Sequence, residues 1–487
     1  MIERESMPCD VLVVGGGPAG LAAAIRLKQI NEELEVVVLE KGSEIGAHIL
    51  SGVVHDPKAL NELFPDWQDM DCPIGDVPVT DNWHWVLRKN GKFPMPHLFM
   101  PPLMSNKGNY TGSLANLTRW LGEQAEGLGV MVFPGFPAAE VIYGDDGAVA
   151  GVITQDMGIA ADGSQKPDFQ PGMEIQAKYT LFAEGARGSL TKQLKAKFDL
   201  EKDCQPQTYG LGIKELWEID PKKHVPGRVI HTQGWPLDND SWGGGFLYHI
   251  GDNQVALGFV TALDYANPYL SPYQEFQRWK HHPDILDIIE GGKRVAYGAR
   301  VINEGGWQSV PQLAFPGGAL VGCSAGFVNV PRIKGSHTAM KSGMLAAESV
   351  ASAIAAGKEH TQLDDYEENL RESWIATELK KVKNAQPAIA KLGGDFGTVL
   401  AGIDMWMRTL KIGLPFTLKH TPDYTPTKRA DLFDPIIYPK PDGVISFDRL
   451  TSVAYSFTNH AEDQPTHLKV KDMELQKESE LGVYAGL

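Results

Sequence analysis

The chain has 487 residues, a length that corresponds to about three domains, and its formal net charge of −16 at pH 7 argues against non-specific binding of nucleic acid. Its four cysteines, Cys9, Cys72, Cys204 and Cys323, are far apart and form no C-x-x-C pair, so neither a disulfide framework nor a zinc site is expected. The longest uncharged span, residues 307–331, is broken by glycines and prolines and cannot form a membrane-spanning helix.

The first elements predict a dinucleotide-binding unit. Residues 11–14 read as a buried strand, 21–29 as an Ala-rich helix and 36–39 as a second strand. The glycines of a G-x-G-x-x-G pattern stand before the helix, and an acid ends the second strand. Such glycines allow a tight turn, the approach of a pyrophosphate and close helix packing, whereas the acid accepts hydrogen bonds from ribose hydroxyls. The predicted cofactor-binding residues here are Gly15, Gly17, Pro18, Ala19, Gly20, Glu40 and Lys41.

An unusual apolar segment, KFPMPHLFMPPLMSNK, occupies residues 92–107. Its prolines exclude a regular helix, so we expect an irregular loop. Two interpretations stay open: a buried lid over an active site, or a loop that enters a lipid surface or lines an apolar substrate channel.

Two later segments return to the opening theme of strand, turn and helix. Residues 179–190 place a short strand before a glycine-bearing turn, and residues 317–357 place a strand at 319–322 before a helix that begins near Ser336 or His337. The positive end of that helix would face the flavin pyrimidine edge. Together with residues 11–40, these segments predict one discontinuous FAD-binding domain. They exclude a plain NAD dehydrogenase, whose dinucleotide fold is usually continuous.

Residues 205–310 have a different character, with many aromatic residues and short strand patterns. They predict an antiparallel-sheet domain inserted into the dinucleotide fold.

A helix with a large apolar face is expected at residues 396–410. The face contains Phe396, Val399, Leu400, Ile403, Trp406, Met407 and Leu410, at helical spacing. This pattern fits an ordinary packed helix as well as an interfacial helix that lies in a bilayer surface. From residue 422 the tail is Pro-rich and is expected to wrap over the body.

Collinear motifs along the whole chain resemble the electron-transfer-flavoprotein:ubiquinone oxidoreductase family. They include GAHILSGVVHDP, LFAEGARGSLTKQL, PQTYGLGIKELW, FQRWKHHP, EGGKRVAYGAR, GCSAGFVNVPRIKGSHTAMKSGMLAAES, YPKPDGVISFD and NHAEDQPTHL. The Gly322-Cys323 pair, at the position of the usual Gly-Asp flavin motif, also fits this family better than the hydroxylases.

The resemblance implies an α/β fold, with a Rossmann-like FAD domain of the glutathione-reductase and hydroxylase type. The expected parts are a first FAD-binding segment (1–204), a quinone-binding antiparallel sheet (205–310), a returning FAD segment (311–360), and C-terminal helices with a wrapping tail (361–487). The implied activity is transfer of electrons from reduced electron transfer flavoprotein through FAD to ubiquinone. Since the cofactor carries this chemistry, no catalytic side chain is expected.

The resemblance also implies site residues. Gly322, Gly326, Ser336 and Thr338 are expected to contact the flavin. Gly243 and Gly244 are expected to contact the ubiquinone head group; the alternative for this pair is a plain sheet bulge. Membrane contacts fall on Phe93, Phe99, Leu103, Phe396 and Trp406.

Three further expectations concern partners and location. The family carries a [4Fe–4S] cluster held by four cysteines, but no cysteine follows Cys323, so we expect no metal ligands in this chain. Either the sequence is a fragment, which the family-like tail at 430–487 favours, or the cluster lies on a separate ferredoxin-like partner. Residues 1–8 leave no room for a signal segment, and we expect a peripheral location on the cytoplasmic face of a bacterial inner membrane. Two alternatives remain: a FAD-dependent reductase or hydroxylase of a lipid or polyprenyl substrate, which a direct NADH-oxidation assay would reveal, and a flavoprotein subunit that needs the ferredoxin-like partner.

Overall fold

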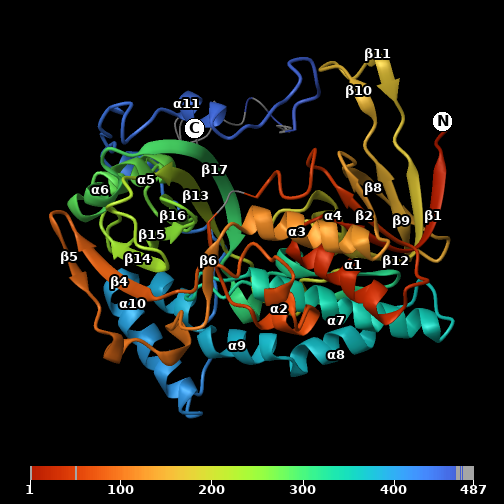
Figure 1. Cartoon of the computed structure of the whole chain (residues 1–487), viewed down its shortest axis with the longest axis horizontal. Helices are drawn as coiled ribbons and strands as arrows, with labels where there is room; N and C mark the ends of the chain where they lie inside the picture. The colour runs from red at the N-terminus through yellow and green to blue at the C-terminus, as the bar shows by residue number, and fades with distance from the viewer. Residues whose placement is uncertain (1–2, 50–51, 468–471, 473, 475–487) are drawn as a thin grey trace.

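The computed structural model of the protein describes residues 3–49, 52–467, 472 and 474. Two sheets lie side by side, and helices run along the lower edge of both in Figure 1. Residues 475–487 of the expected C-terminal part lie outside the described residues.

The first sheet has a parallel centre that consists of β19, β12, β1, β2 and β7. These strands are near-continuous apolar runs because both faces of a parallel sheet are covered. Across the sheet the order is β18 (Ala314–Phe315), β19 (Gly318–Leu320), β12 (Glu174–Phe182), β1 (Ser6–Val14), β2 (Val36–Glu40) and β7 (Met131–Pro134), with β9 (Val149–Thr154) and β8 (Ala138–Tyr143) branching from β12.

Glycines allow the helices of this domain to pack closely. A Cβ atom on Gly343 would lie 2.1 Å from the backbone oxygen of Ala19, where α7 meets α1. The helices packed in this domain are α1 (Pro18–Ile30), α2 (Lys58–Leu63), α3 (Leu114–Gly127), α4 (Ser189–Lys197), α7 (Ser336–Ala355), α8 (Asp364–Glu372) and α9 (Trp374–Val382). The predicted strands and helices of residues 11–40 and 179–190 are all present, and the dinucleotide fold is discontinuous as expected.

The second sheet is antiparallel except where β14 and β4 run parallel. In order it consists of β17 (Lys293–Asn303), β13 (Tyr209–Glu218), β16 (Gln254–Ala262), β15 (Gly243–Ile250), β14 (Arg228–Gly234), β4 (Asp81–Arg88) and β5 (Gly91–Pro94). The expected block 205–310 therefore omits two strands of this sheet. The reason is that β4 pairs with β14 over a separation of 147 positions, which a local pattern does not reveal.

The two faces of the second sheet have different coverings. On one face Trp279 of α5 (Pro272–Lys280) lies over Gly245, since a Cβ there would be 2.3 Å from its ring. The other face turns toward the first domain, where Lys214 Nζ donates to Gly52 O at 2.8 Å.

The remaining elements are short or C-terminal. They are β3 (Val53–His55) with β6 (Tyr110–Gly112), β10 (Met157–Ile159) with β11 (Gln165–Gln170), α6 (Pro283–Ile289), α10 (Ala385–Thr409) and α11 (Arg449–Ala454). The expected helix 396–410 is the second part of α10, which is broken at Gly393 (φ 79°). The tail wraps as expected, since Ile436, Ile445 and Phe447 pack against the core of the second sheet.

Candidate functional site

The glycine-rich turn after β1 fits a bound dinucleotide. Gly15 has a φ of +112°, and a Cβ atom there would lie 2.5 Å from Ala183 O. A Cβ on Gly20 would lie 2.1 Å from Gly15 O, whereas no atom lies within 4 Å of the corresponding position on Gly17. The turn thus demands glycine at two positions and is open at the third, above the N-terminus of α1, where a pyrophosphate would be stabilised.

Glu40 ends β2 beside this turn. Its Oε2 accepts a hydrogen bond from Gly16 N–H at 3.0 Å, and its Oε1 accepts one from Gly42 N–H at 2.7 Å. The carboxylate is therefore held in place by two backbone donors, with lone pairs left for ribose hydroxyls. Pro18 is the first residue of α1, Ala19 is buried, and Lys41 is exposed.

The returning segment brings its predicted residues to the same helix. Gly322 has a φ of +60°, and its Cβ would lie 2.8 Å from Ala19 Cβ. Ser336 begins α7, with its hydroxyl 3.2 Å from His55 Nδ1, and Thr338 Oγ1 donates to Gly335 O at 2.9 Å. Gly326 has a φ of +91° in the intervening turn. These residues fit FAD, whose ring the N-terminus of α7 would face, and the redox chemistry would come from the flavin.

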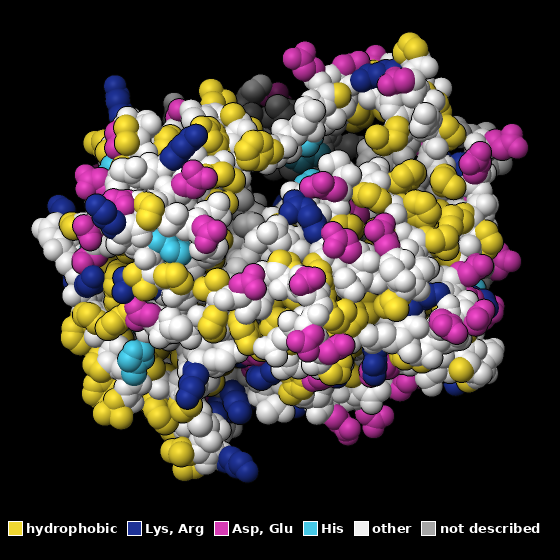
Figure 2. Space-filling model, in the orientation of Figure 1, with side chains coloured by type: hydrophobic (Ala, Val, Ile, Leu, Met, Phe, Trp, Pro, Cys, Tyr) yellow, Lys and Arg dark blue, Asp and Glu magenta, His cyan; other side chains and the backbone are white. Residues whose placement is uncertain are grey.

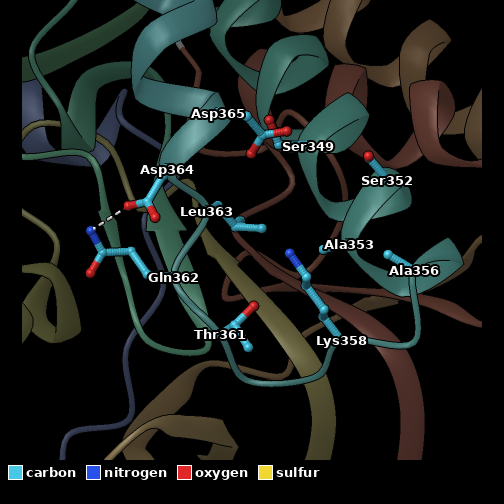
Figure 3. A pocket seen from close by; sticks show the side chains of 10 residues that line it. All are labelled: Ser349, Ser352, Ala353, Ala356, Lys358, Thr361, Gln362, Leu363, Asp364 and Asp365. Atoms are coloured by element: carbon cyan, nitrogen blue, oxygen red, sulfur yellow. Dashed lines mark hydrogen bonds between the residues drawn. The ribbon is translucent and has the colours of Figure 1, made fainter.

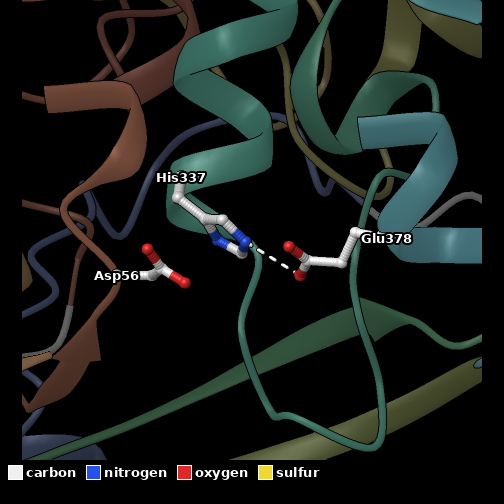
Figure 4. A group of neighbouring side chains, drawn as sticks. All are labelled: Asp56, His337 and Glu378. Carbon is white, nitrogen blue, oxygen red and sulfur yellow. Dashed lines mark hydrogen bonds and ion pairs between the residues drawn. The ribbon is translucent and has the colours of Figure 1, made fainter. Parts of the chain in front are cut away.

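A charged cluster fixes the start of α7. Asp56, His337 and Glu378 each have a side-chain atom that could bind a metal ion, and these three atoms lie within 4.8 Å of one another (Figure 4). Arg332 already bridges the carboxylates, with Nη2 2.8 Å from Asp56 Oδ2 and Nη1 2.9 Å from Glu378 Oε1. The guanidinium supplies the positive charge that a metal ion would bring, so the cluster is a structural clamp.

The clamp shifts the pKa values of its carboxyls. Burial raises the pKa of Glu378, but the hydrogen bond from His337 and the charges of His337, Arg332 and Lys58 outweigh burial and hold that pKa well below its usual value. The pKa of Asp56 is also lowered, because His337 and Arg332 outweigh its burial. Both groups are therefore carboxylates at neutral pH.

Gly243 and Gly244 lie at the start of β15. The pairing of β15 with β16 is continuous through both glycines, so no bulge lies between these two strands, and the pairing of β15 with β14 begins at Gly245. Cβ atoms on the two glycines would lie 2.1 Å from Val260 O and 2.2 Å from Thr232 O, so the sheet itself requires glycine at both positions. Gly244 pairs with Val260, which pairs with Gly212, and this row belongs to the face turned toward the first domain.

The expected membrane residues lie together at the lower left of the molecule. Hydrophobic side chains gather there in Figure 2, over the loop after β5 and over α10. The exposed members are Phe93, Leu98, Phe99, Leu392, Phe396, Val399, Ile403, Leu410, Ile412 and Phe416. We call this set the apolar surface. Trp406 Nε1 donates to Phe99 O at 3.0 Å, which joins the two segments.

Helix α10 has the reverse of ordinary packing. In its second part the inner face contains Gly397, Ala401, Asp404 and one larger apolar residue, Met405, whereas Phe396 is 77% exposed. An ordinary packed helix would bury the larger apolar side chains. Among the expected membrane residues, Leu103 and Trp406 are only partly exposed, and Leu103 packs against the cluster that contains Ala385, Ala401 and Met405. In the described part of the chain no helix is long and apolar enough to cross a membrane.

A surface pocket lies at the other end of α7, between that helix and the start of α8 (Figure 3). Its lining includes Ser349, Lys358 and Asp364, and Gln362 Nε2 donates to Asp364 Oδ1 at 2.9 Å. A helix of 20 residues is about 30 Å long, so this pocket is remote from the glycine-rich turn.

Three residues with structural roles were not identified by any pattern in the sequence. Arg332 forms the clamp, Glu304 is a buried carboxyl group beside the turn at Gly326, and Asn239 caps the second part of α10 by accepting from Asp395 N–H at 2.8 Å. Each acts through contacts between distant segments, which no local pattern contains.

The cysteines do not fit an iron–sulfur cluster. All four are free, and among the described residues the only group of three or more candidate ligand side chains is the clamp. No step of the chemistry is therefore assigned to a cluster on these residues.

Three family models match the chain. The description "ETF-QO, ubiquinone-binding" matches residues 209–302, "NAD(P)-binding Rossmann-like domain" residues 13–64, and "Electron transfer flavoprotein-ubiquinone oxidoreductase, 4Fe-4S" residues 443–487. The last match does not support the expectation that the chain lacks the iron–sulfur region, although residues 443–487 contain no cysteine.

Solved structures show the fold alone. A geranylgeranyl bacteriochlorophyll reductase-like protein from Thermoplasma acidophilum has a TM-score of 0.60 at 19% identity, covering 82% of this chain and 92% of its own. A flavin-dependent brominase has a TM-score of 0.56 at 16% identity, covering 83% and 92%. These likenesses agree with the mixed α/β fold.

Curated relatives match along the whole chain. The mitochondrial electron transfer flavoprotein-ubiquinone oxidoreductase of Homo sapiens is 51% identical over 498 residues, which cover 100% of this chain and 80% of the relative. The enzyme of the same name from Pseudomonas aeruginosa is 51% identical over 491 residues, covering 99% and 89%. With the ubiquinone-binding match on the second sheet, these relatives show that the chain belongs to the electron transfer flavoprotein-ubiquinone oxidoreductase family.

Proposed function

We propose that this chain accepts electrons from reduced electron transfer flavoprotein and passes them, through bound FAD, to ubiquinone at a membrane surface. The observation that carries the proposal is the second sheet, which matches the ubiquinone-binding family model and turns one face toward the predicted flavin site. The relatives bear the same activity in their names.

In this proposal the protein residues bind and orient, and the flavin supplies the redox chemistry. The open turn at Gly17 and the N-terminus of α1 hold the pyrophosphate, and Glu40 holds a ribose. The N-terminus of α7, fixed by the clamp, faces the flavin ring. The quinone head group binds against the face of the second sheet that contains Gly244.

The apolar surface is the proposed route for the quinone tail. Its exposed phenylalanine and aliphatic side chains would lie in the lipid interface, where a long isoprenoid is dissolved. The chain would then be a peripheral protein, on the cytoplasmic face of a bacterial inner membrane, and Phe93, Phe99, Phe396 and Trp406 would contact lipid.

The cluster remains a separate proposal. The 4Fe-4S match supports a cluster in the working enzyme, and a [4Fe–4S] cluster needs four thiolates. We propose that these thiolates lie outside the sequence given, either on a longer form of the chain or on a ferredoxin-like partner. Iron analysis of the protein isolated from its native source, with its partners retained, distinguishes these two sources.

Donor specificity tests the function. The FAD-loaded protein is mixed without oxygen with reduced electron transfer flavoprotein or, separately, with NADH or NADPH. The proposal predicts that the flavoprotein bleaches the bound flavin, whereas the nicotinamides leave it oxidised. Bleaching by NADPH together with no response to the flavoprotein would favour the reductase or hydroxylase alternative.

A further inference from the structure

Glu304 is a buried carboxyl group on the face of the second sheet that is turned toward the first domain. It follows the last residue of β17, its side chain is 3% exposed, and its N–H donates to Thr208 O at 2.7 Å. A Cβ atom on Gly210 would lie 2.2 Å from Glu304 Oε1 and 3.1 Å from Val260 Cγ1. The carboxyl group therefore lies above Gly210, beside the side chain of Val260.

The strand register places this group on the same face as Gly244. Gly244 pairs with Val260, and Gly210 pairs with Ala262, two residues further along the same strand. Side chains of directly paired residues, and of residues two apart, share a face. Since β15 and β13 flank β16 at about 4.8 Å each and the two glycines are offset by two residues along the strands, Gly210, below the carboxyl group, lies about 12 Å from Gly244.

The neighbours of Glu304 in the chain are linked to the predicted flavin-binding turn. Gln207 Nε2 lies 2.6 Å, and Asn303 Nδ2 3.8 Å, from the position of a Cβ on Gly326. Gln207 Oε1 accepts from the N–H of Gly305, the neighbour of Glu304, at 2.7 Å. The segment that carries Glu304 therefore joins the predicted flavin turn to the second sheet.

Polar atoms around Glu304 have no partners. Among the described residues, the buried atoms Glu304 Oε2, Thr208 Oγ1, Asn303 Oδ1 and Gln207 Nε2 make no hydrogen bond. Buried polar groups are normally satisfied, and unsatisfied atoms on Glu304 and on its backbone partner Thr208 indicate that a ligand or water completes the site.

Two further carboxyl groups lie beside Tyr209, the residue between Thr208 and Gly210. Asp264 follows Leu263, whose N–H donates to Tyr209 O at 2.9 Å, and the backbone of Tyr209 is hydrogen-bonded to Asp423. Burial, followed by the charges of Asp264 and Asp423, raises the pKa of Glu304 well above its usual value, which favours the protonated form of this group. Burial also raises the pKa values of Asp264 and Asp423, which are only half-buried, and Arg187 faces Asp423. The burial of these acids decreases from Glu304 outward.

We propose that Glu304 is the proton donor to the quinone and is recharged from solvent through Asp264 and Asp423. This inference rests on the proposed reduction of ubiquinone. A bound reduced flavin would supply the two electrons and would release its own protons to solvent. The Glu304 O–H bond breaks as a quinone O–H bond forms, and the resulting carboxylate takes a proton from the outer acids, which take theirs from water. A second proton follows the same route and completes the quinol.

The variant Glu304→Gln tests the proposal because it keeps the size and hydrogen bonding of the side chain but cannot release a proton. We expect reduction of the flavin by electron transfer flavoprotein to be unchanged. Reoxidation by a short-chain ubiquinone should slow about 100-fold, the contribution of a general acid, and should lose its pH dependence. The matched control is Glu290→Gln, on an exposed residue beyond α6.

Infrared difference spectra test the same role without measuring turnover, and they can be recorded on the wild-type protein. In the wild-type protein, adding the quinone should shift the carbonyl band of a protonated carboxylic acid, and this band should be missing from Glu304→Gln. A wild-type spectrum without such a band, or a variant that reduces quinone at the wild-type rate, would overturn the role of Glu304 alone. A wild-type protein that reduces no quinone would overturn the proposed function as well.

Discussion

The indole N–H of Trp406 donates a hydrogen bond to the backbone oxygen of Phe99 at 3.0 Å, across 307 positions of sequence. This bond fixes the proline-rich loop against α10, with the apolar side chains of both segments facing outward. The two segments that the sequence singled out separately thus form one surface, which supports a shared role at the membrane.

Charging the apolar surface should abolish membrane binding without unfolding the protein. Phe99 and Phe396 are 66% and 77% exposed, so the double variant Phe99→Glu, Phe396→Glu removes little internal packing. Each phenylalanine contributes about 2 kcal/mol on burial in lipid, and the added carboxylates oppose insertion. Sedimentation with phospholipid vesicles should show a loss of binding of about 100-fold or more.

The matched control for this prediction is Met157→Glu. Met157 is 51% exposed on β10, far from α10 (Figure 1). Its variant should bind vesicles like the wild type. Equal loss in both variants would mean that added charge, rather than its location, determines binding.

Replacing Glu40 by Gln should weaken FAD binding. The carboxylate of Glu40 accepts hydrogen bonds from two backbone N–H groups. The amide has the same volume, but its NH₂ group would face one of these N–H groups and could not accept a hydrogen bond from it. Loss of a hydrogen bond to a charged group costs about 1.5–3 kcal/mol, so the dissociation constant measured by equilibrium dialysis should rise about 10- to 100-fold. Glu44→Gln, in the same loop but paired with Arg119 at the surface, should bind FAD normally, and equal affinities for all three proteins would contradict the role of Glu40.

The clamp at the start of α7 should make stability depend on acid pH. Because the folded-state pKa values of Glu378 and Asp56 lie below their ordinary values of 4.5 and 3.8, their stabilising contribution is complete above about pH 5 and is lost as the pH falls through the lowered values. Arg332→Met should cost about 3–5 kcal/mol at neutral pH and flatten the decline of the melting temperature between about pH 5 and 3. Arg371→Met removes an exposed ion pair with Glu367 and should change neither the stability at neutral pH nor the decline of the melting temperature with acid. Parallel curves for wild type and Arg332→Met would contradict the assignment.

A second buried ion pair should stabilise the second sheet and helix α5, which packs on it. Lys280 Nζ lies 2.9 Å from Glu215 Oε2, and both side chains are fully buried. Lys280→Met leaves Glu215 with Arg294 as its remaining cation, and the free energy of unfolding should fall by about 3–5 kcal/mol. Adding Glu215→Gln should restore part of that loss, whereas Lys222→Met, on an exposed residue, should change little. Denaturant titrations measure each value, and an unchanged free energy in Lys280→Met would refute a stabilising pair.

The sequence was sufficient for the local parts of the fold. The Gly15–Glu40 unit, the start of α7 at Ser336 and the apolar face around Phe396 follow from glycine spacing and apolar periodicity. Those signals are local, because the residues that produce them are neighbours in the chain.

Long-range pairing was not predictable in the same way. The addition of β4 to the second sheet, the break of α10 at Gly393 beside Asn239, and the location of Glu304 above Gly210 all depend on residues that meet only after folding. The requirement for glycine at positions 243 and 244 also has a structural cause that the motif alone did not reveal. Alanine variants there would disturb the sheet and would not report on quinone binding.

The most direct test of the proposed function is a single turnover on quinone-containing vesicles. In the absence of oxygen, two equivalents of reduced electron transfer flavoprotein reduce the FAD-loaded protein. The quinol formed is then measured by chromatography. The account predicts one quinol for each reduced flavin in the wild type, and far less in the Phe99→Glu, Phe396→Glu variant. A flavin that stays reduced beside unchanged ubiquinone in the wild type would contradict it.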